Sequence, residues 1–143
     1  MLLQVCALLP VVCGLSGCGG SKFQMAPVSG VCLCNGNPIE AGLVVFEPIP
    51  ESGTSLQESG RSASGMLNPD GTFVLSTFGR NDGAIVGKHK VLVFAPPLED
   101  DDAPLTDENR YACGNQPVEQ EITPGENNIQ LALTHTPSKA RRR

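Results

Sequence analysis

Apolar and polar residues alternate in short runs from Pro27 to about Thr134. Side chains two residues apart lie on the same face of a β-strand, and Gly, Pro, Asn and Asp separate the runs as turn residues do. No segment repeats apolar residues at helical spacing over more than one turn. We therefore expect an all-β domain, a single β-sandwich of about seven strands. The expected strands cover residues 28–35, 42–48, 61–67, 72–77, 88–94, 118–122 and 128–134.

The intervening segments predict turns and loops. Asp70-Gly71 supplies the positive φ angles of a tight hairpin between residues 61–67 and 72–77, and residues 123–126 predict a final hairpin. Residues 51–60 have no periodicity and indicate a loop that could carry a short edge strand. Residues 98–115 are acidic and interrupted by proline, which indicates a long excursion. Glycines 30, 36, 42, 71 and 87 mark strand ends or turns. The inward positions predict a core of Val44, Phe46, Phe73, Leu75, Val91, Val93, Ile129, Leu131 and Leu133.

The first 17 residues predict a removable signal peptide. Residues 2–15 are almost entirely apolar and too short to span a membrane as a helix. They end in Leu15-Ser16-Gly17-Cys18, which resembles the lipobox of bacterial lipoproteins. Small side chains before the cysteine admit the peptidase, so we expect cleavage between Gly17 and Cys18 and lipidation of the Cys18 thiol. Residues 18–26 would then form a flexible leash. The alternative is a short buried helix with an incidental match, and the absence of an initial Lys or Arg departs from the usual signal peptide.

Charge is distributed unevenly along the chain. Ten basic and 15 acidic side chains give a formal net charge of −5. Four of the basic groups lie in the last five residues, and the rest of the chain is more acidic than the total indicates. An acidic body repels phosphate backbones, so we expect no nucleic-acid partner. Residues 136–143 predict a disordered basic tail, with contact to anionic lipid as the alternative.

Several motifs, in order, resemble the carboxypeptidase regulatory-like domains, which are transthyretin-like (prealbumin-like) sandwiches. The resemblance covers residues 27–135 and implies a Greek-key β-sandwich. His89 departs from it, standing where that family usually has Tyr, and Cys32 and Cys34 replace aliphatic residues. The motifs are Val28-Ser29-Gly30-Val31 with the turn from Asn35 to Ile39, Gly42-x-Val44-x-Phe46-x-Pro48, Asn68-Pro69-Asp70-Gly71-Thr72-Phe73, Gly87-Lys88-His89-Lys90-Val91-Leu92-Val93, and Arg110-Tyr111 followed by residues 122–128.

Three cysteines remain beyond Cys18, namely Cys32, Cys34 and Cys113. Cys32 and Cys34 share a strand face with Cα atoms about 6.5–7 Å apart and parallel Cβ vectors, so we do not expect a bond between them. Our first interpretation is that both are small buried hydrophobic residues. The alternative is a bridge from Cys113 to one of them in an oxidising compartment. Cys-x-Cys without a nearby His is a weak indication of zinc.

Catalytic motifs are missing from the sequence. Neither His89 nor His135 lies in a metalloprotease or nucleophile motif, and no phosphate-binding or dinucleotide-binding loop is present. We expect no enzymatic activity and no cofactor, and we expect His89 to fill a Tyr-like position at the edge of the core. Asp100, Asp101 and Asp102 are weak candidates for calcium ligands, although solvated acidic residues explain them equally well.

The sequence therefore predicts a non-catalytic, membrane-anchored lipoprotein. Its sandwich would serve cell-envelope structure or protein–protein contacts on the periplasmic or outer-membrane face. The alternative is an accessory module that binds carbohydrate or calcium. Carbohydrate sites usually need exposed aromatic rings, and Phe78 and Tyr111 are the two in expected loops.

Overall fold

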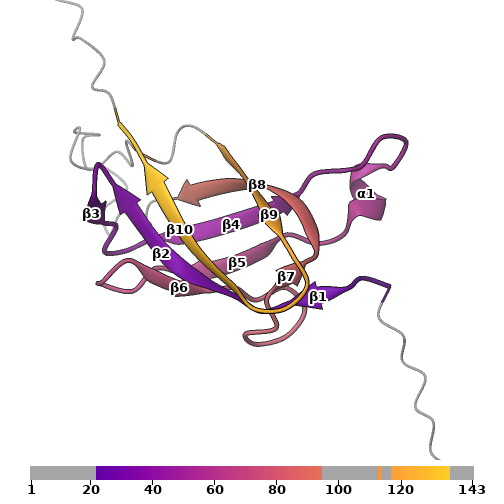
Figure 1. Ribbon diagram of the computed structural model, residues 1–143, viewed down its shortest axis with the longest axis horizontal. Coiled ribbons are helices and arrows are strands. Elements are labelled where there is room, and N and C mark those ends of the chain that lie inside the picture. Colours follow the sequence, from indigo (N-terminus) through magenta and orange to yellow (C-terminus); the bar gives the residue numbers. More distant parts are fainter. Residues whose placement is uncertain (1–21, 95–112, 114–116, 136–143) are drawn as a thin grey trace, which may run out of the picture.

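Two four-stranded β-sheets pack face to face in the computed structural model, which describes residues 22–94, 113 and 117–135 (Figure 1). The β2-sheet has β2 (Val28–Cys34) at its centre, between β10 (Asn127–Leu133) on one side and β6 (Thr72–Val74) and β3 (Asn37–Pro38) on the other. The β4-sheet has the order β5 (Ala63–Met66), β4 (Leu43–Pro48), β8 (Gly87–Phe94) and β9 (Val118–Ile122). The all-β sandwich expected from the sequence is confirmed.

The strands with three or more residues match the seven expected segments, with ends that differ by a few residues. Three two-residue strands were not expected. One is β3, which follows a tight turn at Asn35 (φ 49°) and Gly36 (φ 84°). The others are β1 (Met25–Ala26) and β7 (Ala84–Ile85), which pair with each other. Met25 and Ala26, assigned to the flexible leash from the sequence, therefore belong to the folded domain.

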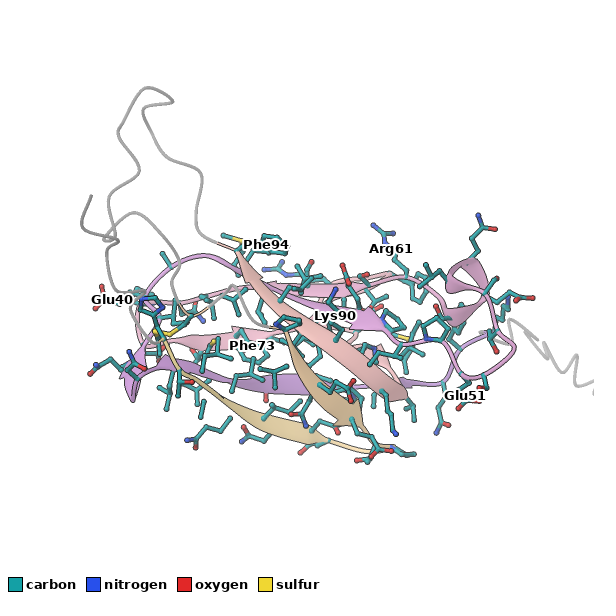
Figure 2. The ribbon with its side chains drawn as sticks, turned by 90° about the horizontal axis from the view of Figure 1, so that it is seen from above. Glu40, Glu51, Arg61, Phe73, Lys90 and Phe94 are labelled. Carbon is teal, nitrogen blue, oxygen red and sulfur yellow. A yellow bond between two sulfur atoms is a disulfide. The ribbon has the colours of Figure 1, made fainter. Side chains whose placement is uncertain are left out.

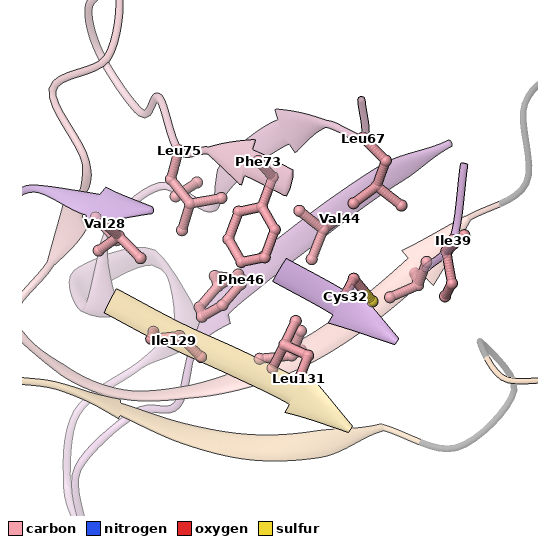
Figure 3. Packing of buried hydrophobic residues seen from close by; sticks show 14 of the residues in the cluster. Val28, Cys32, Ile39, Val44, Phe46, Leu67, Phe73, Leu75, Ile129 and Leu131 are labelled. Carbon is pink, nitrogen blue, oxygen red and sulfur yellow. The ribbon is translucent and has the colours of Figure 1, made fainter. Parts of the chain in front are cut away.

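The core lies between the two sheets (Figure 3). Every inward position named from the alternating pattern is buried, from Val44 and Phe46 on β4 to Leu133 on β10. The rings of Phe46 and Phe73 approach each other across the core, with centroids 6.2 Å apart. Figure 2 shows Phe73 between the sheets, with Glu40 and Glu51 at opposite ends of the sandwich. The period-two pattern was sufficient to identify this core because each sheet buries only one face.

The turn at residues 68–71 closes a local antiparallel hairpin as expected, because Asn68 N donates to Thr72 O at 2.9 Å and Gly71 has a φ of 79°. The arms of the turn at residues 68–71 touch at its base, where Ser64 and Ser76 exchange two backbone bonds of 2.9 Å. However, β5 pairs with β4, whereas β6 pairs with β2, so the turn joins the two sheets. The hairpin predicted at residues 123–126 is wrong, because β9 pairs with β8 and β10 pairs in parallel with β2. The Asn127 side chain closes this arch instead, since its Oδ1 accepts from Thr123 N at 3.0 Å and its Nδ2 donates to Gly125 O at 2.9 Å.

Two further expectations are corrected. The loop at residues 51–60 carries one helical turn, α1 (Leu56–Ser59), rather than an edge strand. Ser55 and Glu58 form a capping box at its start, with Glu58 N donating to Ser55 Oγ at 3.3 Å and Ser55 N donating to Glu58 Oε2 at 3.0 Å. Gly30 lies inside β2 rather than at a strand end. A Cβ at this position would meet the carbonyl oxygen of Ile129 and lie 2.8 Å from the Phe73 ring, so only glycine fits.

Candidate functional site

Two of the three cysteines in the domain form a disulfide, and the third has a free thiol. Cys34, at the end of β2, forms a disulfide with Cys113, and their Cα atoms are 5.8 Å apart. The first interpretation, that Cys34 is an unbonded buried residue, is therefore wrong for this cysteine. Cys34 is only partly buried, whereas Cys32, two residues earlier on β2, is completely buried. The disulfide links Cys113 to Cys34, which is 79 positions earlier in the chain and pairs with β3 at one end of the sandwich.

Cys32 has a free thiol in the core. Burial raises the pKa of the Cys32 thiol to about 11, so the reactive thiolate is scarce at neutral pH. The Cys32 backbone carbonyl lies close to Gly71, where an added Cβ would be 2.8 Å from the oxygen. Cys32 therefore acts as a small apolar residue at a crowded position.

His89 is a buried polar residue on the inner face of β8. It is only 1% exposed, deeper than the core-edge position expected from the sequence, and its ring packs against Phe46 with centroids 6.0 Å apart. Nδ1 lies 3.1 Å from the Gly87 carbonyl oxygen, and Nε2 has no hydrogen-bond partner among the described residues. Burial lowers the pKa of His89, and the bond to Gly87 only partly opposes this effect. The imidazole is therefore neutral, with Nδ1 as donor and Nε2 as an unused acceptor.

A pocket of about 590 Å³ opens beside His89, at the α1 end of the sandwich. Apolar and acidic side chains meet there. Its lining includes Phe23, Pro48, Ile85, Glu51, Glu58 and Glu121. The lining therefore offers the carboxylates of three glutamates and several serine and threonine hydroxyls, together with the Lys88 amine. Such a surface can accept hydrogen bonds from hydroxyl or amino groups.

Phe78 is the exposed aromatic residue that the sequence singled out and the structure describes. Its ring is stacked on that of Phe23 with centroids 6.2 Å apart and planes 13° apart, and the side chain remains 54% exposed. Lys22 Nζ lies 5.4 Å from the centre of the Phe23 ring. The stacked pair thus connects the first described residues to the loop after β6.

The Phe78 loop is held by Asp82. The Asp82 carboxylate accepts from the backbone N–H groups of Thr77, Phe78 and Gly79 at 2.7, 3.0 and 2.8 Å. Burial raises the pKa of Asp82, but these donors together outweigh burial and leave the pKa below its usual value. Asp82 therefore shapes a turn, as expected from Asp82-Gly83, and its oxygens are already occupied.

Several sequence-predicted positions lie outside the described residues. These are the cleavage and lipidation positions Gly17 and Cys18, the acidic residues Asp100, Asp101 and Asp102, Tyr111, and the basic tail at residues 136–143. Within the described ranges, no three His, Cys, Asp or Glu side chains converge as a metal site, and no helix is long and apolar enough to cross a membrane.

The pocket beside His89 was not anticipated from the sequence. It is built from α1, the end of β4, the start of β8 and residues before β1, which are far apart in the chain. The pattern Ser55-x-x-Glu58 is a local signal for the helix start at α1. Pocket formation depended on tertiary packing that no local pattern encodes.

Comparisons with known proteins place few constraints on this chain. No protein-family model matches the sequence, and no curated protein matches it. Among solved structures, the chain is similar to the crystal structure of a DUF3823 family protein from Parabacteroides merdae, with a TM-score of 0.45 and 13% sequence identity. The match covers 77% of this chain and 46% of that protein, so this chain spans less than half of its length.

Proposed function

We propose that this protein is a non-catalytic lipoprotein, anchored to a bacterial membrane through Cys18, whose β-sandwich serves envelope structure or protein–protein contacts. The observation that carries the proposal is the Cys34–Cys113 disulfide. Such bonds persist in oxidising compartments outside the cytoplasm. This location agrees with export directed by residues 1–17 and with the lipobox Leu15-Ser16-Gly17-Cys18. The resemblance to carboxypeptidase regulatory-like domains supports the same interpretation.

Lipid attachment can be tested directly in a bacterial host that processes lipoproteins. We expect the full chain to incorporate alkyne-palmitate, to sediment with membranes, and to begin at a modified Cys18 in intact-mass analysis. Cys18→Ser should abolish incorporation. Cys13→Ser, a matched change within the predicted signal peptide, should leave it unchanged. An unmodified Cys18 in the wild-type chain would refute the anchor.

The contact function has a separate test. Crosslinking in intact cells, followed by purification of the tagged full chain, should recover a defined protein partner or a second copy of the chain. Recovery of the uncrosslinked monomer alone would contradict this function even if lipidation succeeds. The two results are independent because the lipid and the sandwich surfaces lie in different parts of the chain.

Ligand binding is the second candidate, and the pocket beside His89 is the observation that favours it. Its acceptor groups suit a hydroxyl-rich ligand such as a carbohydrate. Calorimetry with a glycan panel should show saturable heat that His89→Phe reduces and His135→Phe does not. Absence of heat for every glycan would reject a carbohydrate role. Calcium, the other ligand of this candidate, is tested in the same titration.

A further inference from the structure

Among the described strands, β10 is an edge strand with one unpaired side. It pairs through seven residues with β2, and no other described strand is hydrogen-bonded to its opposite edge. Its inward side chains Ile129, Leu131 and Leu133 are buried, whereas Asn128, Gln130 and Ala132 are exposed. The buried side chains therefore hold β10 against the core, while the backbone groups on its outer edge have no partner strand among the described residues.

The direction of the backbone groups follows from two hydrogen bonds at the ends of the strand. Asn127 N donates to Pro27 O at 3.0 Å, and Asn35 N donates to Leu133 O at 2.9 Å. In a parallel pair, alternate residues direct both N–H and C=O toward the same neighbour. Residues 127, 129, 131 and 133 thus face β2. Asn128, Gln130 and Ala132 direct their backbone groups away from it, and unpaired groups of this kind form a template for another strand.

β9 is one of the two edge strands of the other sheet, and it differs from β10 in charge. Glu119 and Glu121 are exposed on β9, whereas β10 has no ionisable side chain. Antiparallel pairing of two β9 strands about Gln120 would set Glu119 of one copy opposite Glu121 of the other. Like charges directly opposite are destabilising. β9 is thus protected against self-pairing in the usual manner of edge strands, and β10 is not.

We propose that β10 joins two copies of this chain across a two-fold axis, which makes the two β2-sheets one continuous sheet. Antiparallel pairing centred on Gln130 sets Gln130 opposite Gln130 and Asn128 opposite Ala132. In this register each outward N–H of one copy meets an outward carbonyl of the other, and no charges are opposed. The same patch serves both copies, as a two-fold interface requires.

This inference assigns a partner and a surface to the proposed contact function. It rests on the proposed function because it takes the partner to be a protein. It does not depend on the lipid anchor. The two bodies are both acidic, with a formal charge of −5 per chain. Association should therefore strengthen as salt screens their repulsion. Binding of a basic partner would show the opposite dependence on salt.

The test is sedimentation equilibrium of the full chain in a density-matched detergent. We expect a reversible monomer–dimer equilibrium in the wild type. Gln130→Lys and Gln130→Glu place like charges opposite each other at the axis, and each should raise the dimer Kd roughly fivefold or more. An equimolar mixture of the two variants should restore dimers, because Lys then lies opposite Glu. This rescue is specific to a two-fold pairing centred on Gln130.

Gln57→Lys is the matched control, because Gln57 is exposed on α1 and the change in charge is the same. It should leave the Kd unchanged. A wild type that stays monomeric at every concentration would overturn the proposal, as would equal effects of Gln57→Lys and Gln130→Lys. Failure of the mixed variants to recover would exclude self-pairing and point to an extended segment of another protein. Cys18→Ser removes the anchor but should preserve the dimer, so the two proposals fail independently.

Discussion

The central strands of the two sheets fill the core in opposite ways. β4 contributes the large side chains of Val44 and Phe46 and pairs antiparallel with both neighbours. β2 contributes Gly30 and Cys32 after Val28, and it pairs in parallel with β10 and antiparallel with β3 and β6. The inner faces of the two sheets are therefore complementary in shape. Gly30 leaves room for the Phe73 ring, and that ring lies 6.2 Å from the ring of Phe46, centroid to centroid.

The largest expected effect comes from removing that space. Gly30→Val places a side chain against the Ile129 carbonyl and the Phe73 ring, so β2 can no longer pair with β10 at its present distance. We expect a loss of more than about 4 kcal/mol in unfolding free energy, or no folded protein. Ser29→Val, on the exposed face of the same strand, is the control and should be nearly neutral. Urea denaturation monitors both, and equal stability of the two variants would contradict the packing argument.

The disulfide at the end of β2 should have the next largest effect. Cys34→Ser opens a loop that closes over 79 positions, and we expect a loss of about 2–4 kcal/mol. Cys113→Ser should cost the same, and the double variant should cost no more than either single one. Reductant should lower the melting temperature of the wild type to that of these variants. A wild type that is insensitive to reductant would indicate that the bridge does not stabilise the fold.

A smaller effect depends on pH and concerns the β4-sheet. Burial holds the pKa of His89 below the ordinary value of 6.5, so the unfolded chain takes up this proton before the folded one does. Stability should therefore fall as pH decreases below about 6.5, before carboxylates titrate near pH 4. His89→Phe should flatten this part of the profile, and His135→Phe should not. Identical profiles for the wild type and His89→Phe would exclude His89 as the source.

The smallest effect is expected for an exposed ion pair between β4 and β8. Lys90 Nζ lies 3.7 Å from Glu47 Oε2, and both side chains are nearly half exposed. Glu47→Gln should change unfolding free energy by less than about 0.5 kcal/mol, because water and salt screen such pairs. A loss above about 1 kcal/mol in denaturant titrations would show that this ion pair is more tightly organised than its exposure indicates.

Local sequence predicted the strands well and their partners poorly. Phe73, Val91 and Leu131 were assigned to the core because alternation along a strand fixes which face each residue occupies. The same alternation contains no information on which strand lies alongside. Thr123-Pro124-Gly125-Glu126 therefore looks like a hairpin turn, although its two arms enter different sheets. The number of residues between Cys34 and Cys113 likewise does not predict their disulfide. The bond forms only because the folded chain brings Cys113 back beside the end of β2.

The candidate site was less predictable than the fold. His89 was recognised as filling a position near the core, but its unpaired Nε2 and the pocket beside it depend on α1, β4 and residues before β1 meeting at one end. Glu119 and Glu121 are visible in the sequence, yet their role on an edge strand appears only once β9 is known to have one neighbour.

The period of two and the turn residues were enough to predict the all-β class, the inward face of each strand and the approximate positions of the main strands. Only the folded chain reveals the parallel pairing of β2 with β10, the passage of the chain between the sheets, the bonding of Cys32, Cys34 and Cys113, and the edge position of β10 among the described strands. These features join residues that are distant along the chain. Their energies come from backbone pairing and close packing in space, which a local pattern does not record.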